Sequence, residues 1–315
     1  MRILLLGANG QVGHALRGPL AAHGEVVAST RSGRLPDGSP CLAADLAEPG
    51  RLPALVAAVA PDLVVNAAAY TAVDRAEDEP ALAHRINAEA PGVLARACAA
   101  RDLRLVHLST DYVFDGSLRR PLRESDPVAP LGVYGQSKWL GEEAVRASGA
   151  RHRIFRLSWV YAGRGGNFLL TMLRLARERG HLRVVADQVG APTAAHCIAA
   201  AIARSLDKAP AASGTWHLAA DGECSWHGFA AAIFEGAVAR GLLAAMPELE
   251  PISTDQYPTR AKRPAYSRLD SSAFARDFGG GPGHWRDGLA EVLDDLAAAA
   301  NGPAHRGPMP GDALT

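Results

Sequence analysis

The stretch RILLLGANGQVGHAL, residues 2–16, constrains the fold of this chain more than any other segment. Its opening apolar run predicts a strand that is buried on both faces of a parallel sheet. Gly7, Gly10 and Gly13 follow and lead into a helical pattern over residues 11–22. In such a turn the first glycine allows a tight bend, the second lets a phosphate approach the backbone, and the third lets the helix pack closely. The stretch therefore predicts a dinucleotide-binding turn.

Strand-like and helix-like segments alternate through the first half of the chain. Strands are predicted over residues 25–29, 62–69, 103–110 and 153–161, and helices over residues 49–60 and 80–101. This alternation predicts right-handed crossovers and an α/β fold built on a doubly wound parallel Rossmann sheet. Ligands of such sheets bind at the carboxyl ends of the strands, so the functional residues are expected there.

A looser pattern after residue 160 indicates a second, smaller unit. We expect an NADP-binding Rossmann domain over residues 1–160, with a return segment over about 184–218. A smaller α+β substrate-binding domain is expected over about 161–183 and 219–300, ending in a helix. The tail over residues 301–315 is rich in Gly and Pro, and we expect it to be disordered.

Bulk composition excludes several classes of partner. Lys+Arg and Asp+Glu both total 33, so the formal net charge is zero and offers no general attraction to nucleic acid. No apolar run reaches the ~18 residues of a membrane span, and the first apolar run is too short for a signal peptide. The four cysteines are scattered without a CxxC pair, which is typical of free thiols. We therefore expect a cytoplasmic protein that binds neither nucleic acid nor membranes.

The end of the second predicted strand bears on the choice of nicotinamide cofactor. An acidic residue at this point would bond the ribose 2′-hydroxyl of NAD. This chain has Thr30 there, followed by Arg31, which can bind a 2′-phosphate or can be an ordinary solvated arginine. Asp45 and Leu46, after a short third strand, suit an adenine-edge contact. The small residues of 66–71 suit close passage under a ribose or nicotinamide. NADPH is the expected cofactor, with NADH as an alternative.

A hydroxyl pair, a tyrosine and a lysine predict the chemistry. Ser109 and Thr110 end a strand, and Tyr134 and Lys138 follow with the i,i+4 spacing that places two side chains on one helix face. A phenol is a poor acid at its ordinary pKa of about 10. A nearby ammonium would lower that pKa, and a hydroxyl from the strand end would bond the substrate oxygen. Together with the glycine turn, this group predicts a carbonyl reductase.

Several longer motifs carry a resemblance to a known family. They are GANGQVG, VNAAAYTAVDRAEDEP, STDYVFDG, PLGVYGQSK, FRLSWVYAGRGGNF, DQVGAPT and YPTRAKRPAYSRLD. Through them the chain resembles the extended short-chain dehydrogenase/reductases over residues 1 to about 298. Within that class it is similar to the dTDP-4-dehydrorhamnose reductases.

The resemblance implies a site and a reaction. The catalytic residues would be Thr110, Tyr134 and Lys138. Together with Gly7 and Arg31, the cofactor-binding residues would be Gly10, Gln11, Val12, Thr30, Asp45, Leu46, Ala69, Tyr70, Thr71, Tyr134 and Lys138. The dTDP-sugar would touch Thr110, Asp111, Trp159 and, through its diphosphate, the basic loop containing Arg263, although that loop can equally be a solvated one. Hydride would reach the C4 carbonyl carbon of the sugar while Tyr134 protonates the oxygen.

Two other functions stay open at this point. One is a 4-ketoreductase for a different dTDP-deoxysugar of a glycoside pathway, whose active site can be identical. The other is a non-catalytic regulatory subunit of the methionine adenosyltransferase type, because some relatives of the family serve that role. The intact Thr110, Tyr134 and Lys138 argue against the second function, since a binding subunit does not need them.

One departure from the family concerns metal and assembly. Some members dimerise through a magnesium ion held by three glutamates, and the matching positions here are Ala15, His196 and Asp295. Alanine offers no ligand, and histidine is a poor ligand for Mg²⁺, which prefers oxygen. We therefore predict that no bridging Mg²⁺ binds, with no metal ligand among the predicted site residues, and a monomer or a metal-independent dimer.

Overall fold

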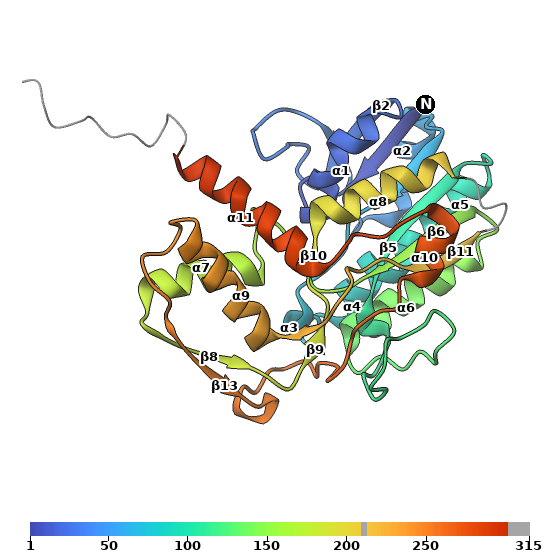
Figure 1. The fold of residues 1–315 in the computed structure, drawn as a ribbon. Helices are drawn as coiled ribbons and strands as arrows, with labels where there is room; N and C mark the ends of the chain where they lie inside the picture. Colours follow the sequence, from blue (N-terminus) through green and yellow to red (C-terminus); the bar gives the residue numbers. More distant parts are fainter. Residues whose placement is uncertain (209–212, 302–315) are drawn as a thin grey trace, which may run out of the picture.

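The computed structural model describes residues 1–208 and 213–301 (Figure 1). The tail that we expected to be disordered lies, from residue 302 onward, outside the described residues. Within the described part, no helix combines the length and the apolar character needed to cross a membrane.

Seven parallel strands form the central sheet, in the order β11-β6-β5-β4-β1-β2-β3. They are β1 (Arg2–Leu6), β2 (Glu25–Thr30), β3 (Leu42–Ala43), β4 (Leu63–Asn66), β5 (Arg104–Thr110), β6 (Arg151–Leu157) and β11 (Gly214–His217). Leu4 of β1 pairs with Val27 of β2 on one side and with Val64 of β4 on the other. The strand order reverses between β1 and β4, which is where the carboxyl ends of parallel strands receive a ligand. The predicted doubly wound sheet is confirmed.

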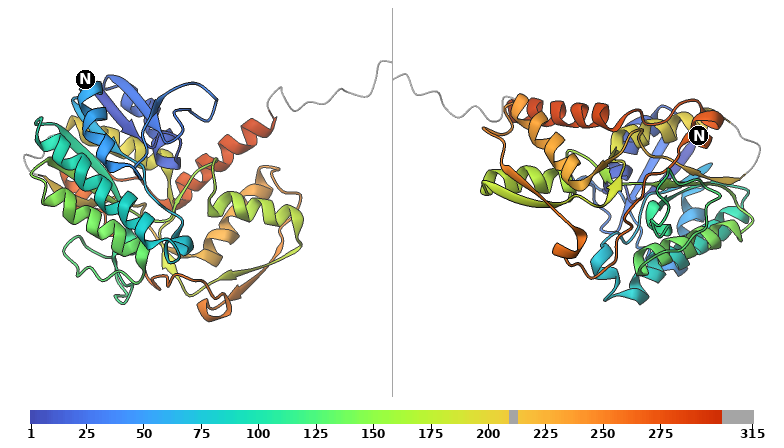
Figure 2. Two further views of the ribbon diagram at one scale, coloured as in Figure 1. Left: turned by 180° about the vertical axis from the view of Figure 1, so that it is seen from behind. Right: turned by 60° about the horizontal axis from the view of Figure 1, so that its bottom comes forward.

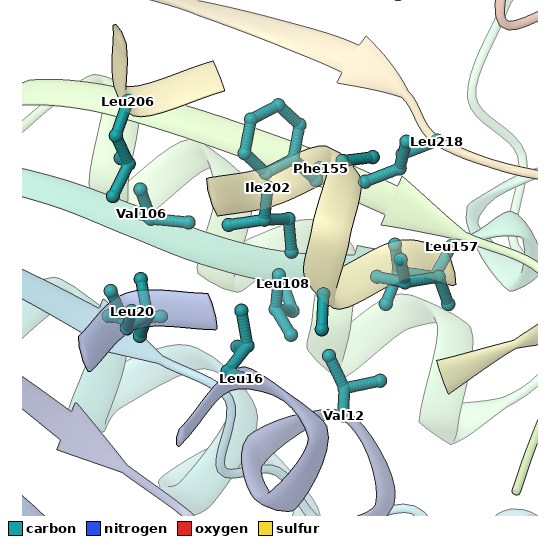
Figure 3. Close-up of a cluster of buried hydrophobic side chains, with 14 of the residues drawn as sticks. Val12, Leu16, Leu20, Val106, Leu108, Phe155, Leu157, Ile202, Leu206 and Leu218 are labelled. Atoms are coloured by element: carbon teal, nitrogen blue, oxygen red, sulfur yellow. The ribbon is translucent and has the colours of Figure 1, made fainter. Parts of the chain in front are cut away.

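Helices cover both faces of this sheet. Ile3 and Leu5 of β1 belong to one buried cluster, whereas Leu4 and Leu6 belong to another, because alternate side chains of a strand point to opposite faces. The first face is covered by α1 (Gln11–Ala21), α8 (Ala195–Asp207) and α10 (Ser272–Phe278), and its core is shown in Figure 3. The second face is covered by η1 (Pro49–Arg51), α2 (Leu52–Val59), α5 (Ala90–Ala99) and α6 (Val133–Arg146).

The predicted single helix over residues 80–101 differs from the structure. Its first turn, α4 (Pro80–His84), leads into a π-helical turn, η2 (Arg85–Glu89), before α5 begins. The widened turn brings the carbonyl of Asn87 so close to α6 that a Cβ on Gly141 would lie 2.0 Å from its oxygen. Such turns are set by tertiary fit and occur frequently at functional sites, so helical periodicity alone does not predict them.

A smaller unit lies beside the carboxyl ends of the central strands (Figures 1 and 2). Three two-stranded pairings contribute to it and to its junction with the sheet: β7 (Val160–Tyr161) with β10 (Thr193–Ala194), β8 (His181–Val185) with β13 (Glu248–Ile252), and β9 (Val189–Gly190) with β12 (Cys224–Ser225). Its helices are α7 (Phe168–Glu178), α9 (Trp226–Ala239) and α11 (Trp285–Asn301). The remaining short elements are α3 (Val73–Ala76), η3 (Asp111–Val113) and η4 (Thr254–Gln256). Side chains of α7, α9 and α11 form a third buried cluster.

We propose a division of the chain that refines the one expected from sequence. Because β8 pairs with β13, the return to the larger unit begins after residue 185. Helix α10 belongs with the larger unit, since Phe274 and Phe278 both pack edge-on against Phe155 of β6. The smaller unit then contains two segments of the chain, as expected, with α10 taken out of the second.

Candidate active site

The glycine turn has the geometry that its sequence predicts. Gly7 has φ +79°, a conformation that side chains rarely adopt, and a Cβ there would lie 2.7 Å from the backbone nitrogen of Ala68. A Cβ on Gly13 would lie 2.1 Å from the Gly7 oxygen, so only glycine allows this approach of α1 to the turn. Gly10 precedes α1, and no side chain caps the first turn of the helix. Its N–H groups are therefore available to an anion such as a pyrophosphate.

The cofactor-selecting edge is open to solvent. Thr30 is buried at the end of β2, where its hydroxyl donates to the Arg34 carbonyl oxygen (3.0 Å) and accepts from the Arg34 N–H (3.1 Å). The Thr30 side chain therefore shapes the following loop. Arg31 is exposed and makes no hydrogen bond or ion pair with any residue that the structure describes. Asp45 accepts a hydrogen bond from the Ala47 N–H (2.9 Å) two residues past β3.

Residues after β4 are held by a side chain that sequence reasoning missed. Asn87, fully buried in η2, accepts from the Tyr70 N–H (2.8 Å) and donates to the Tyr70 carbonyl oxygen (2.9 Å). It also donates to Ser137 on α6 (3.0 Å). The predicted cofactor segment, Ala69 to Thr71, is thereby tied to the helix that carries the predicted catalytic pair. An asparagine inside an alanine-rich helix was the available signal, because it is a poor helix former.

Helix α6 places Tyr134 in its first turn and Lys138 one turn later, on the same face. The helix begins where the Glu77 carboxylate accepts from the Val133 N–H (2.8 Å). Lys138 is buried, and its ammonium donates to the Leu108 carbonyl oxygen on β5 (2.6 Å). Burial lowers the pKa of Lys138 to about 8, although the nearby Glu142 carboxylate acts in the opposite direction.

The pKa of the Tyr134 phenol is not lowered in this structure, contrary to the expectation from sequence. Burial raises its pKa to about 12, the hydrogen bond with Thr110 lowers it, and the Asp111 carboxylate raises it. Lys138 does not counter this shift, because its ammonium is directed to the Leu108 carbonyl. At neutral pH the phenol is therefore fully protonated, which is the form that a proton donor requires.

The two hydroxyls that end β5 point to different partners. Thr110 donates to Asp111 Oδ1 (3.0 Å) and bonds with Tyr134, so it lies at the predicted catalytic group. Ser109 instead donates to Glu142 Oε1 behind the strand (2.5 Å). That carboxylate also receives two hydrogen bonds from the buried Arg156 guanidinium, at 2.9 and 2.7 Å. This buried ion pair was not predicted from sequence, and through Glu142 it links α6 to β5 and β6.

Asp111 is a buried carboxylate with bonds to distant segments. Ser158 donates to Asp111 Oδ2 (2.9 Å), and Thr110 bonds the other oxygen. Burial raises the pKa of Asp111 to about 6, although hydrogen bonds from Ser158, Thr110 and Ser267 act against this rise. The predicted substrate residue is thus fixed by the larger unit and by the loop near residue 267.

Trp159 lies where the chain passes from the sheet to the smaller unit. Its backbone has φ +45°, its indole N–H donates to Ser267 (3.1 Å), and its ring stacks on Trp226 of α9 at 3.5 Å. A Cβ on Gly190 would lie 2.5 Å from the indole, so the ring is held from both sides. Trp226 was not predicted from sequence, because α9 reads as an ordinary apolar helix.

Arg263 is engaged within the protein. Its guanidinium donates to both oxygens of Asp74, at 2.7 and 3.2 Å, and Arg260 pairs with Asp78. No pattern in the sequence predicts these pairs, because their partners lie more than 180 residues apart in the chain. A small pocket between α3, the start of α6 and residues 261–264 is lined by Tyr134 and Tyr112. A larger groove along α1 and β2 does not contain any of the predicted catalytic residues.

A parallel sheet with a glycine turn at its switch point, and with Thr110, Tyr134 and Lys138 gathered at one carboxyl edge, defines an extended short-chain dehydrogenase/reductase. The model of the family described as RmlD substrate binding domain matches residues 1–298. The chain belongs to the dTDP-4-dehydrorhamnose reductase family.

Relatives and solved structures match along nearly the whole chain. The dTDP-4-dehydrorhamnose reductase of Burkholderia thailandensis is 46% identical over 305 residues, which cover 94% of this chain and 99% of the relative. That of Salmonella typhimurium is 43% identical over 300 residues, with 94% and 98% covered. The crystal structure of dTDP-4-dehydrorhamnose reductase from Bacillus anthracis in complex with NADP is 32% identical, covers 93% of this chain and 99% of its own, and has a TM-score of 0.84.

Proposed function

We propose that the protein reduces the C4 keto group of dTDP-4-dehydro-β-L-rhamnose to give dTDP-L-rhamnose, with NADPH as the reductant. One observation carries the proposal. A chain that matches reductases of this name over 94% of its length also brings Thr110, Tyr134 and Lys138 together at the edge of the sheet where the glycine turn lies. Relatives that bear the same name, and one that is in complex with NADP, support the substrate and the cofactor.

The residues around the turn fit a dinucleotide. A Cβ on Gly10 would meet only the Gly7 oxygen, at 3.4 Å, so its outer side is open to a pyrophosphate. The uncapped N–H groups of α1 add hydrogen-bond donors there. Arg31 is exposed beside the end of β2, where it can pair with a 2′-phosphate, and Thr30 leaves no carboxylate to repel one. When bound, NADPH supplies the hydride that the carbonyl carbon accepts.

The protein's own groups supply the proton and hold the oxygen. Tyr134 donates its phenolic proton to the oxygen as negative charge develops on it. The Thr110 hydroxyl bonds the same oxygen and orients it toward the phenol. Lys138, whose pKa of about 8 keeps it largely charged at neutral pH, lies one helical turn from Tyr134, and its ammonium would stabilise the remaining phenolate after turning away from the Leu108 carbonyl oxygen. Asp111 and the Trp159 ring are the proposed contacts to the sugar nucleotide.

The test is a coupled measurement of cofactor and product. The purified protein is incubated with NADPH and dTDP-4-keto-L-rhamnose, and the absorbance of the reduced nicotinamide is followed while the product is separated and identified. We expect one NADPH oxidised per dTDP-L-rhamnose formed. Turnover of a different dTDP-4-keto sugar with a clearly higher kcat/KM would overturn the substrate assignment but leave the reductase assignment in place. No oxidation with any of them would overturn both.

We also propose that the reaction takes place in the cytoplasm. All four cysteines are free thiols, and each of these residues is partly or fully buried. Free thiols are typical of a reducing compartment. Fractionation of the source cells, with the protein followed by antibody and by NADPH-dependent activity, tests this location.

A further inference from the structure

A histidine, a cysteine and a glutamate lie close together where α8 and α11 meet. His196 and Cys197 stand in the first turn of α8, and Glu291 stands on α11, 95 residues further along the chain. His196 Nε2 lies 2.6 Å from Glu291 Oε2 and 3.2 Å from Cys197 Sγ. In Figure 1 the beginning of α11 lies beside the beginning of α8, near β10. Among the described residues this is the one group of three or more such side chains whose ligand atoms all lie within 4.8 Å of one another.

The geometry does not suit a nucleophile and its base. In a catalytic relay the histidine bonds the nucleophile through one ring nitrogen and the orienting carboxylate through the other. Here the thiol and the carboxylate both approach the same nitrogen, Nε2. Three ligand atoms that all lie within 4.8 Å of one another can instead be shared by one bound ion.

We propose that His196, Cys197 and Glu291 form a binding site for Zn²⁺, or for a similar borderline transition-metal ion, with water as the fourth ligand. Cysteine, histidine and carboxylate are the ligands that Zn²⁺ takes in proteins, at about 2.0–2.3 Å. Tetrahedral geometry at these bond lengths separates ligand atoms by roughly 3.3–3.7 Å. The His196–Glu291 contact has to open by about 1 Å, and both side chains, 40% and 63% exposed, have the freedom to turn.

The chemistry of the site selects the class of ion. Mg²⁺ prefers six oxygen ligands, and this group offers one carboxylate, one imidazole and one thiol. Binding converts the Cys197 thiol to a thiolate and releases one proton to solvent, since a metal-bound cysteine is deprotonated. A bound ion would join α8, which packs in the larger unit, to α11, which packs in the smaller one. The predicted consequence is stabilisation of the folded chain.

The test uses the full chain after removal of any affinity tag. The protein is treated with EDTA, transferred to chelator-free buffer and titrated with ZnCl₂ in a calorimeter. We expect one Zn²⁺ per chain. A parallel titration with Co²⁺ is expected to give the sulfur-to-cobalt charge-transfer absorption of a thiolate ligand. Excess Mg²⁺ is expected not to displace either ion, and displacement by Mg²⁺ would overturn the proposal.

Zn²⁺ binding to variants tests whether these three residues are the ligands. Glu291→Gln and His196→Ala are each expected to weaken Zn²⁺ binding at least ~10-fold, and Cys197→Ser is expected to abolish the charge-transfer band. Glu291 is largely exposed, so Glu291→Gln keeps the test valid even where Cys197→Ser alters folding. His181→Ala is the matched control, because His181 and Glu250 form a similarly exposed pair at 3.1 Å that is not part of such a cluster. Equal losses in the control and in His196→Ala, or no saturable binding at all, would overturn the proposal.

Discussion

The two ends of the proposed cofactor site differ in how firmly the protein holds them. At the catalytic end Thr110, Asp111 and Lys138 are buried, and each is bonded to another part of the chain. At the cofactor-selecting end Arg31 is exposed and has no bonded partner among the described residues. The groups proposed for catalysis are thus positioned by packing and hydrogen bonds before any ligand binds. The proposed recognition of the 2′-phosphate, by contrast, would depend on the exposed Arg31 side chain, which the ligand itself would have to order.

This difference separates the expected effects of substitution. A pre-positioned group is already ordered by folding, so its interaction with the transition state carries no further entropic cost. Removing the group therefore loses the full stabilisation of the transition state. Removing an exposed arginine deletes an interaction that was partly offset by the cost of ordering the side chain. Substitutions at the catalytic end are therefore expected to lower turnover by several orders of magnitude. Those at the cofactor-selecting end are expected to lower kcat/KM by about one order of magnitude.

Tyr134→Phe has the largest expected effect. It removes the proposed proton donor, so turnover is expected to fall by ~10²–10⁴-fold, the range for loss of general acid catalysis. NADPH affinity, measured by fluorescence titration, is expected to change little. Tyr112→Phe is the matched control, since Tyr112 lies edge-on to Tyr134 with ring centroids 5.5 Å apart and loses an equivalent hydroxyl. Near-normal turnover in Tyr134→Phe would exclude this residue as the acid.

Asp111→Asn has the second largest expected effect, which is on the pH dependence of the free energy of unfolding. Its pKa is raised to about 6 from the ordinary 3.8, so the folded state holds a proton that the unfolded state has released between these pH values. The wild type therefore loses about 3 kcal/mol of unfolding free energy from this group as the pH rises from about 4 to about 6. Asp111→Asn cannot ionise and lacks this loss. Urea unfolding of both proteins at several pH values measures the difference.

The control for Asp111 has the opposite sign. The Arg120 guanidinium lowers the pKa of Asp126 to about 2, so its stabilisation is present above about pH 4 and is lost as the pH falls toward 2. The unfolding free energies of Asp126→Asn and wild type should therefore become more alike as the pH falls toward 2. Those of Asp111→Asn and wild type should instead move apart as the pH rises toward neutral. Parallel stability curves for wild type and Asp111→Asn would show that the Asp111 carboxylate does not titrate as proposed.

Arg31→Ala tests the open end of the site. The loss of one charge-assisted contact to the 2′-phosphate costs about 1.5 kcal/mol, or roughly tenfold in kcat/KM for NADPH. The kcat/KM for NADH is expected to stay unchanged, because NADH has no phosphate there. Arg34→Ala removes an exposed arginine of the same loop, whose guanidinium bonds the Gly38 carbonyl, and is the control. Equal losses for both cofactors would indicate a role for Arg31 in loop structure only.

The sequence predicted those features that depend on local pattern. The strand, glycine turn and helix over residues 2–21 follow from periodicity and from glycine's backbone freedom, and the shared face of Tyr134 and Lys138 follows from helix geometry. Partners that come from distant segments were not predicted. Ser158 and Ser267 reach Asp111 from positions 47 and 156 residues away, and no local pattern in the chain specifies such contacts.

For Arg263 the sequence suggested a ligand contact and did not predict the partner within the protein. A basic loop is compatible with a bound diphosphate, and the sequence contains no sign that Asp74, 189 residues earlier, would neutralise it. The π-helical turn at Asn87 has a similar origin, because it accompanies a close approach to Gly141 on α6. Tertiary fit, rather than propensity, decided both features.

The smallest expected effect is on the reaction rate and the assembly when metal is removed, and for both we expect no change. Ala15 packs its methyl group against the core of the larger unit, His196 bonds Glu291, and Asp295 is the one carboxylate at the three positions that carry magnesium ligands in some relatives. Two of three oxygen ligands are therefore missing, and a bridging Mg²⁺ has too few partners. EDTA is expected to leave both the initial rate and the sedimentation coefficient unchanged. The proposed zinc ligands all come from one chain, so stripping that ion would lower thermal stability and leave the mass of the assembly as it was. A dimer that dissociates in EDTA and re-forms with Mg²⁺ would show that the chain binds a bridging ion through other residues.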